Sequence, residues 1–460
     1  MFQIKAIHSP KLWESFLLVI CIVATISVSI IKFEAAPHLP ILFSILLLIG
    51  YGLLQRIPFR ILEKGLVDGA GAGMAAVYLF FFIGILISSW MMSGTIPSLI
   101  YAGFNILTPT YFFAIVFVVT AIVGISIGSS LTTVATVGVA FIGMASVLKL
   151  SLPIAAGAIV SGAFFGDKMS PLSDTTNLAS SIMGVDLFEH IRNMGWTTVP
   201  AFILSLLFFG LLSPTVTSVE FDKITNFQQT LMETGMIHWY TVIPLVVLFV
   251  FTIAKVPATL TLAASSAVAV VLSYFYQFYG VSDVFDILFE GFIPATGVKD
   301  VDALLSGGGM VSMMSTIALV LLGLSMGGLL FTLGIVQSLL SLFERLLKKV
   351  SSVILGSAMT AIGINVLIGE QYLSILLTGQ AFQKQYEKLG LANKNLSRVM
   401  EDAGTVVNPL VPWSVCGIFI TDVLGVPTID YWYFAFFCLL SPILTVLFGY
   451  MGKTLTRTTT

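Results

Sequence analysis

The sequence predicts an all-α polytopic membrane protein with two inverted repeats, broken transmembrane helices and re-entrant hairpins, in about 10 to 12 spans. Of the 460 residues, 57% are hydrophobic and 10% are charged, and the mean hydropathy is +1.02. Soluble domains do not have this balance. Apolar stretches recur along the chain. A polar run at residues 166–177 interrupts one of them, and a similar but less polar run follows at residues 404–414 in the second half.

Ten apolar stretches approach or exceed the length needed to cross a bilayer, which takes about 20 residues. The first is too long for a signal-peptide core, lacks a small-residue cleavage site and is followed at once by a second, so we expect a retained first span. The stretches cover residues 14–33, 39–55, 73–93, 110–128, 196–214, 236–254, 258–279, 310–333, 351–368 and 431–451.

Three short motifs recur at nearly one offset, which indicates an internal duplication. Residues 94–100 resemble residues 334–340, which lie 240 residues later. Residues 124–127 recur 239 residues later, and the Ser170-Pro171-Leu172 motif matches Asn408-Pro409-Leu410 238 residues later. Any one match is weak in a glycine-rich apolar chain, but three in the same order favour two repeats.

Loop charges predict that the repeats are inverted. The loop before the first glycine-rich helix is basic and reads as cytoplasmic, whereas the loop before its counterpart is acidic and reads as external. The basic residues are Arg56, Arg60 and Lys64, and the acidic ones are Asp283, Asp286, Glu290, Asp300 and Asp302. We expect an N-terminal transmembrane helix (1–36), a first repeat (37–215), an external connecting loop (216–239), a second repeat (240–452) and a cytoplasmic tail (453–460), with both termini cytoplasmic.

Prolines inside the polar runs predict two helix breaks. Pro171 cannot donate to the carbonyl of Asp167, four residues earlier. The same spacing places the carbonyl of Thr405 under Pro409 and that of Asn408 under Pro412. We expect these carbonyls to be free and to join hydroxyls and carboxylates as ligands of a hard cation such as Na+.

Two further interruptions, residues 128–133 and 369–372, predict the tips of re-entrant hairpins. Backbone that leaves the helix at membrane depth must line a polar cavity, so we expect two tips and two breaks to meet near the midplane. The candidate cation- and proton-binding residues are Asp174, Asp167, Ser170, Ser173, Thr175, Thr176, Asn177, Ser129, Ser130, Thr132, Thr133, Glu370, Gln371 and Asn408. Candidates for the cavity lining are Tyr372, Trp413 and Ser414.

Asp174, followed by Asp167, is the first candidate for holding Na+ and H+. Burial favours the protonated form of a carboxyl group, which lets H+ and Na+ compete for the same oxygens. Lys168 is the charge partner: it either pairs with one of these aspartates and is released when Na+ binds, or it is a fixed structural counter-charge. Glu401 and Asp402 follow Arg398 near a basic loop and are expected to form an interfacial ion-pair cluster instead.

Other residue types narrow the possible kinds of site and partner. Serine, threonine and glycine in membrane helices also serve close packing, which is the alternative role for the hydroxyls of the first tip. The four histidines fall near expected loops, so a histidine relay is not expected. The three cysteines lack metal-ligand spacing, and no basic patch with interleaved aromatics indicates nucleic acid.

Residues 166–179, 369–372 and 408–413 resemble the NhaC-type Na+/H+ antiporter family, within the ion-transporter superfamily of inverted-repeat carriers. The resemblance implies a secondary antiporter of the bacterial cytoplasmic membrane that exports Na+ in exchange for H+ by alternating access. It also implies a scaffold with a moving, elevator-like transport region, a homodimer within the lipid bilayer, and no cofactor beyond the transported Na+ and H+.

Three alternatives stay open. The family has members that resemble Na+-coupled malate/lactate exchangers, but an organic anion needs a fixed cation or arginine forks, and Lys168 is the sole basic residue in the interrupted segments. An intramembrane aspartyl protease would need Gly-x-Gly-Asp, where this chain has Phe164 two residues before Gly166. A channel would not need titratable groups or two inverted halves. A transporter, not an enzyme, is therefore expected.

Overall fold

The computed structural model describes residues 6–33, 35–106, 110–213, 228–275, 277–294, 298, 301–302, 305–346 and 349–458. These residues form helices joined by short connections, and the extended pairings recorded among them are two isolated bridges, Phe292 with Gly307 and Leu391 with Arg457. The all-α class is therefore confirmed. Of the expected connecting loop, residues 216–227 lie outside the described residues, as do residues 459–460 of the tail.

The first half contains eleven α-helices and one π-helical turn among the described residues. They are α1 (Leu12–Phe33), α2 (His38–Leu54), α3 (Phe59–Ala72), α4 (Met74–Met92), α5 (Thr95–Ile106), α6 (Phe112–Ile127), α7 (Ser130–Thr133), η1 (Val134–Gly138), α8 (Val139–Val147), α9 (Leu152–Met169), α10 (Asp174–Met183) and α11 (Leu187–Leu212).

The second half follows with η2 (Trp239–Val242), α13 (Ile243–Ile253), α14 (Ala258–Ser273), α15 (Val281–Glu290), η3 (Val311–Met313), α17 (Met314–Thr332), α18 (Ile335–Leu346), α19 (Val350–Ile368), α20 (Gln371–Lys388), α21 (Asn393–Met400), the π-helical turn η4 (Glu401–Thr405), η5 (Asn408–Leu410), α22 (Val415–Leu424), α23 (Thr428–Tyr431), η6 (Trp432–Phe434) and α24 (Phe436–Tyr450).

Helices occupy all ten apolar stretches, and their ends follow local capping signals. The largest difference is α11, which begins at Leu187 rather than near residue 196. Asp186 explains the earlier start, because its Oδ1 accepts hydrogen bonds from the N–H groups of Phe188 and Glu189, both at 3.0 Å, and so caps the helix.

The described chain contains six helices long and apolar enough to cross a membrane, or up to eight if each of two bent pairs is one span. Five further apolar helices have 10–17 residues. The chain is therefore a multi-pass membrane protein, and the expected total of about 10 to 12 spans requires several of these shorter helices to cross as well.

The order of elements is similar in the two halves. A 19-residue helix, α4 or α17, is followed by a 12-residue helix, α5 or α18. A long apolar helix, α6 or α19, then ends at a left-handed glycine, after which a capped helix begins. This order supports the duplication, while the inversion of the repeats stays a prediction.

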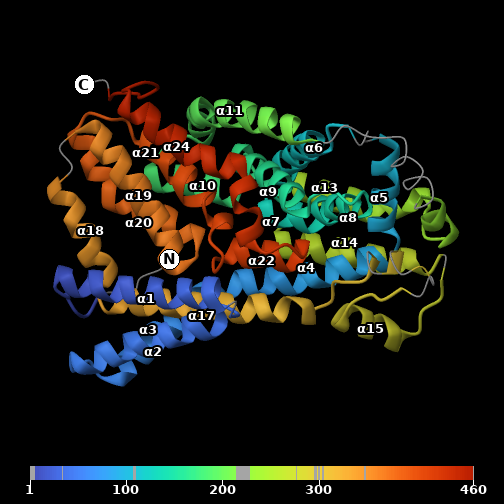
Figure 1. Cartoon of the computed structure of the whole chain (residues 1–460), viewed down its shortest axis with the longest axis horizontal. Helices are drawn as coiled ribbons and strands as arrows, with labels where there is room; N and C mark the ends of the chain where they lie inside the picture. Colours follow the sequence, from blue (N-terminus) through green and yellow to red (C-terminus); the bar gives the residue numbers. More distant parts are fainter. Residues whose placement is uncertain are drawn as a thin grey trace.

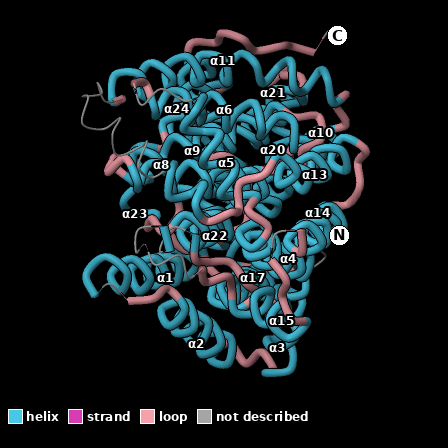
Figure 2. Tube along the Cα trace, turned by 90° about the vertical axis from the view of Figure 1, so that its right-hand side faces the viewer, coloured by secondary structure: helices cyan, strands magenta, loops and turns pink. Residues whose placement is uncertain are grey.

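The halves are intertwined rather than side by side. α3 packs along α17 of the second half, and α14 of the second half packs along α4 of the first. A Cβ atom on Gly69 of α3 would lie 2.3 Å from the carbonyl oxygen of Leu324 in α17, so glycine permits this close approach. In both views, α1, α2, α3, α15 and α17 occupy the lower part, and α11, α21 and α24 the upper part (Figures 1 and 2).

Candidate functional site

The first tip lies between α6 and α7. α6 ends at Gly128, which has φ of +71° and donates its N–H to the carbonyl of Gly124 at 2.8 Å. Ser129 caps α7, since its hydroxyl accepts from the N–H of Thr132 at 3.3 Å. A Cβ atom on Gly128 would meet Leu172 and Ser170, so this tip lies against the first break, as the sequence predicts.

The first break separates α9 from α10 at residues 170–173. The hydroxyl of Ser170 donates to the carbonyl of Ile125 at 2.7 Å, which ties the break to α6. Ser173 caps α10 by accepting from the N–H of Thr176 at 3.4 Å. The carbonyl of Asp167 was expected to be free, but it accepts from the N–H of Ser170 at 3.1 Å, because the last turn of α9 tightens.

Asp167 joins the tip to the break. Its side chain is 4% exposed, and its Oδ2 accepts from the N–H of Ser130 at 3.0 Å. The hydroxyls of Ser130 and Ser173 lie near this carboxylate. A buried carboxylate needs such donors to offset its desolvation, so Asp167 is held in one place by two separate segments.

Asp174 is the accessible carboxylate of the pair. It is the first residue of α10, where the helix dipole favours a negative charge, and its side chain is exposed. This differs from the expectation that it sits in apolar surroundings. Asp167 and Asp174 are thus arranged as an inner and an outer acidic group on one break.

The remaining polar groups of the first half brace the backbone. The Thr176 hydroxyl donates to the carbonyl of Lys168 at 3.1 Å, and Thr175 lies 3.1 Å from the Ser173 hydroxyl. The Asn177 amide donates to the carbonyls of Pro171 and Ser173 at 3.0 and 2.7 Å. In the tip, the Thr133 hydroxyl donates to the carbonyl of Ser129 at 2.8 Å, and the carbonyl of Thr132 accepts from the Thr136 hydroxyl at 2.8 Å.

The second tip repeats the geometry of the first. α19 ends at Gly369 with φ of +75°, and its N–H donates to the carbonyl of Asn365 at 2.8 Å. Glu370 caps α20, because its Oε2 accepts from the N–H of Leu373 at 2.8 Å. Gln371 is buried. The side chain of Tyr372 lies within electrostatic range of Asp174, Glu370 and Asp167, so the second tip approaches the first break.

Asn408 holds the second break to the second tip. Its amide nitrogen donates to Asn365 Oδ1 at 2.9 Å and to the carbonyl of Gly369 at 3.1 Å. Its Oδ1 accepts from the N–H of Cys416 at 3.0 Å. The expectation of a free Asn408 carbonyl is wrong, because that oxygen accepts from the N–H of Val411 at 3.1 Å and from the Ser414 hydroxyl at 2.5 Å.

The two other candidates for the cavity lining, Trp413 and Ser414, form hydrogen bonds with backbone groups. The indole N–H of Trp413 donates to the carbonyl of Val366 at 2.6 Å. Ser414 caps α22, since its hydroxyl accepts from the N–H of Gly417 at 2.9 Å. Trp413 is half-buried and Ser414 is buried.

Lys168 pairs with Asp402, not with Asp167 or Asp174. The ammonium contacts Asp402 Oδ1, and both side chains are 0% exposed. The hydroxyl of Ser441 lies 3.0 Å from Lys168 Nζ and 2.7 Å from Asp402 Oδ1, and the Thr197 hydroxyl donates to Asp402 Oδ2 at 2.9 Å. This surrounding makes Lys168 a structural counter-charge in this conformation.

Sequence reasoning missed the buried position of Asp402 and Glu401. Their place after Arg398 and a basic loop indicated the membrane interface, but both are 0% exposed. His190 was likewise expected near a loop, yet it is buried with its Nδ1 2.8 Å from the Ser397 hydroxyl. The signal that could have found Glu401 and Asp402 is the offset of the repeats, since residue 402 aligns with residue 164 inside the α9 helix.

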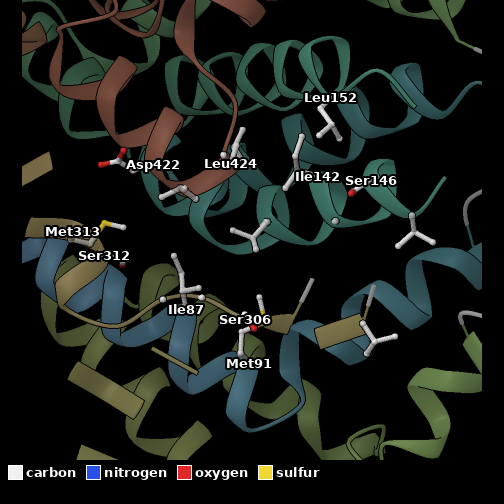
Figure 3. Close-up of a pocket in the computed structure, with 18 of the residues that line it drawn as sticks. Ile87, Met91, Ile142, Ser146, Leu152, Ser306, Ser312, Met313, Asp422 and Leu424 are labelled. Atoms are coloured by element: carbon white, nitrogen blue, oxygen red, sulfur yellow. The ribbon is translucent and has the colours of Figure 1, made fainter. Parts of the chain in front are cut away.

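A large cavity lies apart from the tips and breaks. Its volume is about 940 Å3, and its walls come from α4, α8, α22 and the segment before α17, including Ile87, Ile142, Ser306 and Leu424. Figure 3 shows these side chains from opposite groups of helices. None of the candidate site residues lines it. Among the described residues that line it, the carboxylate is that of Asp422, which accepts from the Thr316 hydroxyl.

The site can offer oxygen ligands to a small cation. Among the described residues, no group of three or more His, Cys, Asp or Glu side chains is placed to hold a metal ion. A Na+ site here would combine one or two carboxylates with hydroxyl and carbonyl oxygens of the first tip and break, which is the ligand chemistry that hard cations take.

Comparisons with known proteins agree on one family. The model of the Na+/H+ antiporter family matches residues 162–453, which include both breaks. The chain is 40% identical over 441 residues to the Na+/H+ antiporter NhaC of Alkalihalophilus pseudofirmus, covering 95% of each chain. It is 35% identical over 454 residues to NhaC of Bacillus subtilis, covering 98% of this chain and 99% of that protein. It is 30% identical over 451 residues to the malate-2H+/Na+-lactate antiporter of Bacillus subtilis, covering 98% and 96%.

Proposed function

The chain belongs to the Na+/H+ antiporter family, and from this premise we propose that it moves Na+ out of the cell in exchange for H+. It is a secondary transporter and not an enzyme. The observation that carries the proposal is the pair of carboxylates on one helix break, Asp174 accessible and Asp167 buried against the first tip. Groups that both bind a cation and accept a proton are what coupled exchange needs.

In this proposal, Na+ and H+ compete for Asp174 and Asp167. When the site opens to the side of higher proton activity, protons neutralise the carboxylates and Na+ leaves. The N–H of Ser130 bonds to Asp167, and the hydroxyls of Ser130 and Ser173 lie near it, so both hydroxyls are placed to turn an oxygen toward a cation held there. Glu370 and Tyr372 of the second tip complete the polar surroundings from the other half.

Alternating access would move one group of helices against another. We propose α2, α3, α4, α14 and α17 as the scaffold, and the helices that carry the tips and breaks, α6–α11 and α19–α24, as the moving region. The cavity between α4 and the pair α8 and α22 supports this division, because a gap between the two groups leaves space for a rigid-body shift.

The location and assembly follow from the same family. We propose the bacterial cytoplasmic membrane as the site of action, with both termini cytoplasmic, inverted repeats with the boundaries given above, and a homodimer as the working unit. Lipid would cover the apolar outer faces of helices such as α1 and α11, where large hydrophobic side chains are exposed.

The second candidate function is Na+- and H+-coupled exchange of malate and lactate, the activity for which one relative is named. Its requirement is a cation that can hold a carboxylate substrate. Lys168 is the sole basic residue of the interrupted segments, and Asp402 neutralises it in a fully buried ion pair. The geometry therefore favours exchange of the inorganic ions alone.

The test uses purified protein in proteoliposomes with a pH dye inside. Na+ is added first, then malate or lactate. Proton movement driven by Na+ without an organic acid supports Na+/H+ exchange. A signal that requires the organic acid would favour the carboxylate exchanger instead.

A further inference from the structure

Glu401 is a fully buried acidic side chain for which no hydrogen bond of normal geometry is found among the described residues. Its exposure is 0%, and the absence of such a bond applies to both carboxylate oxygens. It begins η4, the π-helical turn in the middle of the second half. Thr405, at the other end of the same turn, has the nearest hydroxyl to Glu401, and that hydroxyl makes no hydrogen bond of normal geometry to any described residue. The nearby Thr405 hydroxyl and the ammonium of Lys168 are what could offset the desolvation of a charged carboxylate in this position, and burial outweighs both.

The neighbouring charges do not compensate Glu401. Asp167, Lys168 and Asp402 all act on it electrostatically, which gives three carboxyl groups and one ammonium. The ammonium bonds to Asp402, and the donors around Asp167 come from the first tip and break. Glu401 is thus the member of the cluster that must be neutral, and the neutral form of a carboxyl group carries a proton.

The other elements around the turn bring no further positive charge to Glu401. The turn η4, which contains Glu401, packs against α9, α10, α19, α20, α21 and α24. The guanidinium of Arg398 in α21 bonds to Thr454, at 3.2 Å to its carbonyl and 3.3 Å to its hydroxyl. α19 and α24 contain no charged residue, and α10 contributes Asp174. Lys394 of α21 pairs with Glu189 at 2.8 Å, and Lys384 and Lys388 of α20 are exposed. The other titratable groups of α20 and α24 are Tyr372, Tyr386, Glu387, Cys438 and Tyr450.

We propose that Glu401 is a proton-carrying residue of the exchange, separate from the carboxylates that hold Na+. Its carboxyl group binds a proton in the conformation described here. When the site opens to the other side, the O–H bond breaks, the proton passes to water, and the carboxylate that remains is rehydrated. This inference rests on the proposed Na+/H+ exchange and adds one proton to each cycle.

The alternative is that Glu401 stays protonated throughout and only fills space. The substitution Glu401→Gln separates the two roles, because glutamine copies the shape and neutrality of the protonated side chain but cannot release a proton. The matched control is Glu387→Gln, the same chemical change at an exposed position on α20.

The measurement is the number of protons exchanged per Na+. Proteoliposomes are given fixed Na+ and H+ gradients, and the membrane voltage at which net Na+ flux stops gives the ratio. Glu401→Gln is expected to exchange one proton fewer per Na+ than the wild type, and Glu387→Gln to keep the wild-type ratio. A Glu401→Gln protein with the wild-type ratio and pH profile would overturn the inference.

Infrared spectroscopy tests the inference even if the Glu401→Gln variant does not transport. Infrared spectra of the purified wild type should contain the band of a protonated carboxyl group that is missing from Glu401→Gln and retained in Glu387→Gln. If that band persists in Glu401→Gln, the proton is elsewhere and the inference fails. A wild type that moves no protons on addition of Na+ contradicts the proposed function itself, which keeps the two failures distinct.

Discussion

The ammonium of Lys168 and a carboxylate oxygen of Asp402 form an ion pair between two fully buried side chains that lie 234 residues apart in the chain. Lys168 lies in the last turn of α9 in the first half, and Asp402 lies in η4 of the second. The pair therefore ties the first break to the middle of the other half, next to Glu401. The residues at the corresponding repeat positions, Phe164 and Val406, cannot form a second such pair.

The first prediction concerns the strength of this ion pair. Lys168→Met or Asp402→Ala alone is expected to destabilise the protein by about 3–5 kcal/mol, because each leaves one buried charge uncompensated. The double variant should lose less than the sum of the two single losses. Thermal unfolding of the purified protein in detergent measures all three, and losses that simply add would show that the two charges do not stabilise each other.

The second prediction concerns the glycines at the two tips. Gly128→Ala and Gly369→Ala are each expected to cost about 1–2 kcal/mol from the left-handed backbone alone. A further loss follows, since the added Cβ would lie 2.9 Å from the backbone carbon of Leu172 and 3.0 Å from Ser414 Cα, respectively. Both the unfolding temperature and the exchange rate should fall.

Gly184→Ala is the matched control for the tips. Gly184 also ends a helix, with φ of +62°, but a Cβ atom there meets nothing within 4 Å. It should show the backbone cost without the loss of exchange. Equal loss of exchange in all three variants would mean that the contact of tip and break is unimportant.

Asn408 is predicted to be a structural clamp of the second break. Its amide makes two donor bonds and its Oδ1 accepts a third, so Asn408→Ala should cost about 1–3 kcal/mol by leaving buried partners unsatisfied. Asn393→Ala, which removes a single bond to the carbonyl of Met183, should cost less. Thermal unfolding compares them. If Asn408→Ala kept full stability and lost Na+ binding, Asn408 would be a ligand rather than a clamp.

Glu370 is predicted to combine a cap with a charge that attracts the cation. Glu370→Ala removes the acceptor for the N–H of Leu373 and should cost about 0.5–2 kcal/mol. Glu370→Gln keeps an accepting oxygen and should remain stable. Its half-maximal Na+ concentration should nevertheless rise by about tenfold, equivalent to about 1.4 kcal/mol. An unchanged Na+ dependence would reduce Glu370 to a cap.

The apolar stretches and the positions of glycine and proline predicted much of this fold. The ten apolar stretches are helical, and the positions of Gly128, Pro171 and Gly369 marked the tips and the first break, because glycine and proline act locally. α3 was not predicted, since its polar and glycine-rich sequence reads as a loop. It is a helix because its small residues let it pack closely on α17, a contact with the other half of the chain.

The partners of the charged groups could not be predicted from the sequence. Lys168 has Asp167 beside it and Asp174 within seven residues, yet it pairs with Asp402, which reaches it only when the halves intertwine. The expectation of free carbonyls also failed at Asp167 and Asn408, while that for Thr405 stays a prediction. Proline removes the bond from the residue four positions later, but Ser170 supplies one from three positions later, and the sequence rule does not include this local tightening.

The central claim is that Na+ and H+ are exchanged at the carboxylates of the first break. The most direct test is Na+-driven proton movement in proteoliposomes containing the wild type, Asp174→Asn or Asp430→Asn, the last being the same change at an exposed position in α23. We predict that Asp174→Asn abolishes the signal while Asp430→Asn responds like the wild type. An Asp174→Asn protein that still exchanges Na+ for H+ at the wild-type rate would contradict the account.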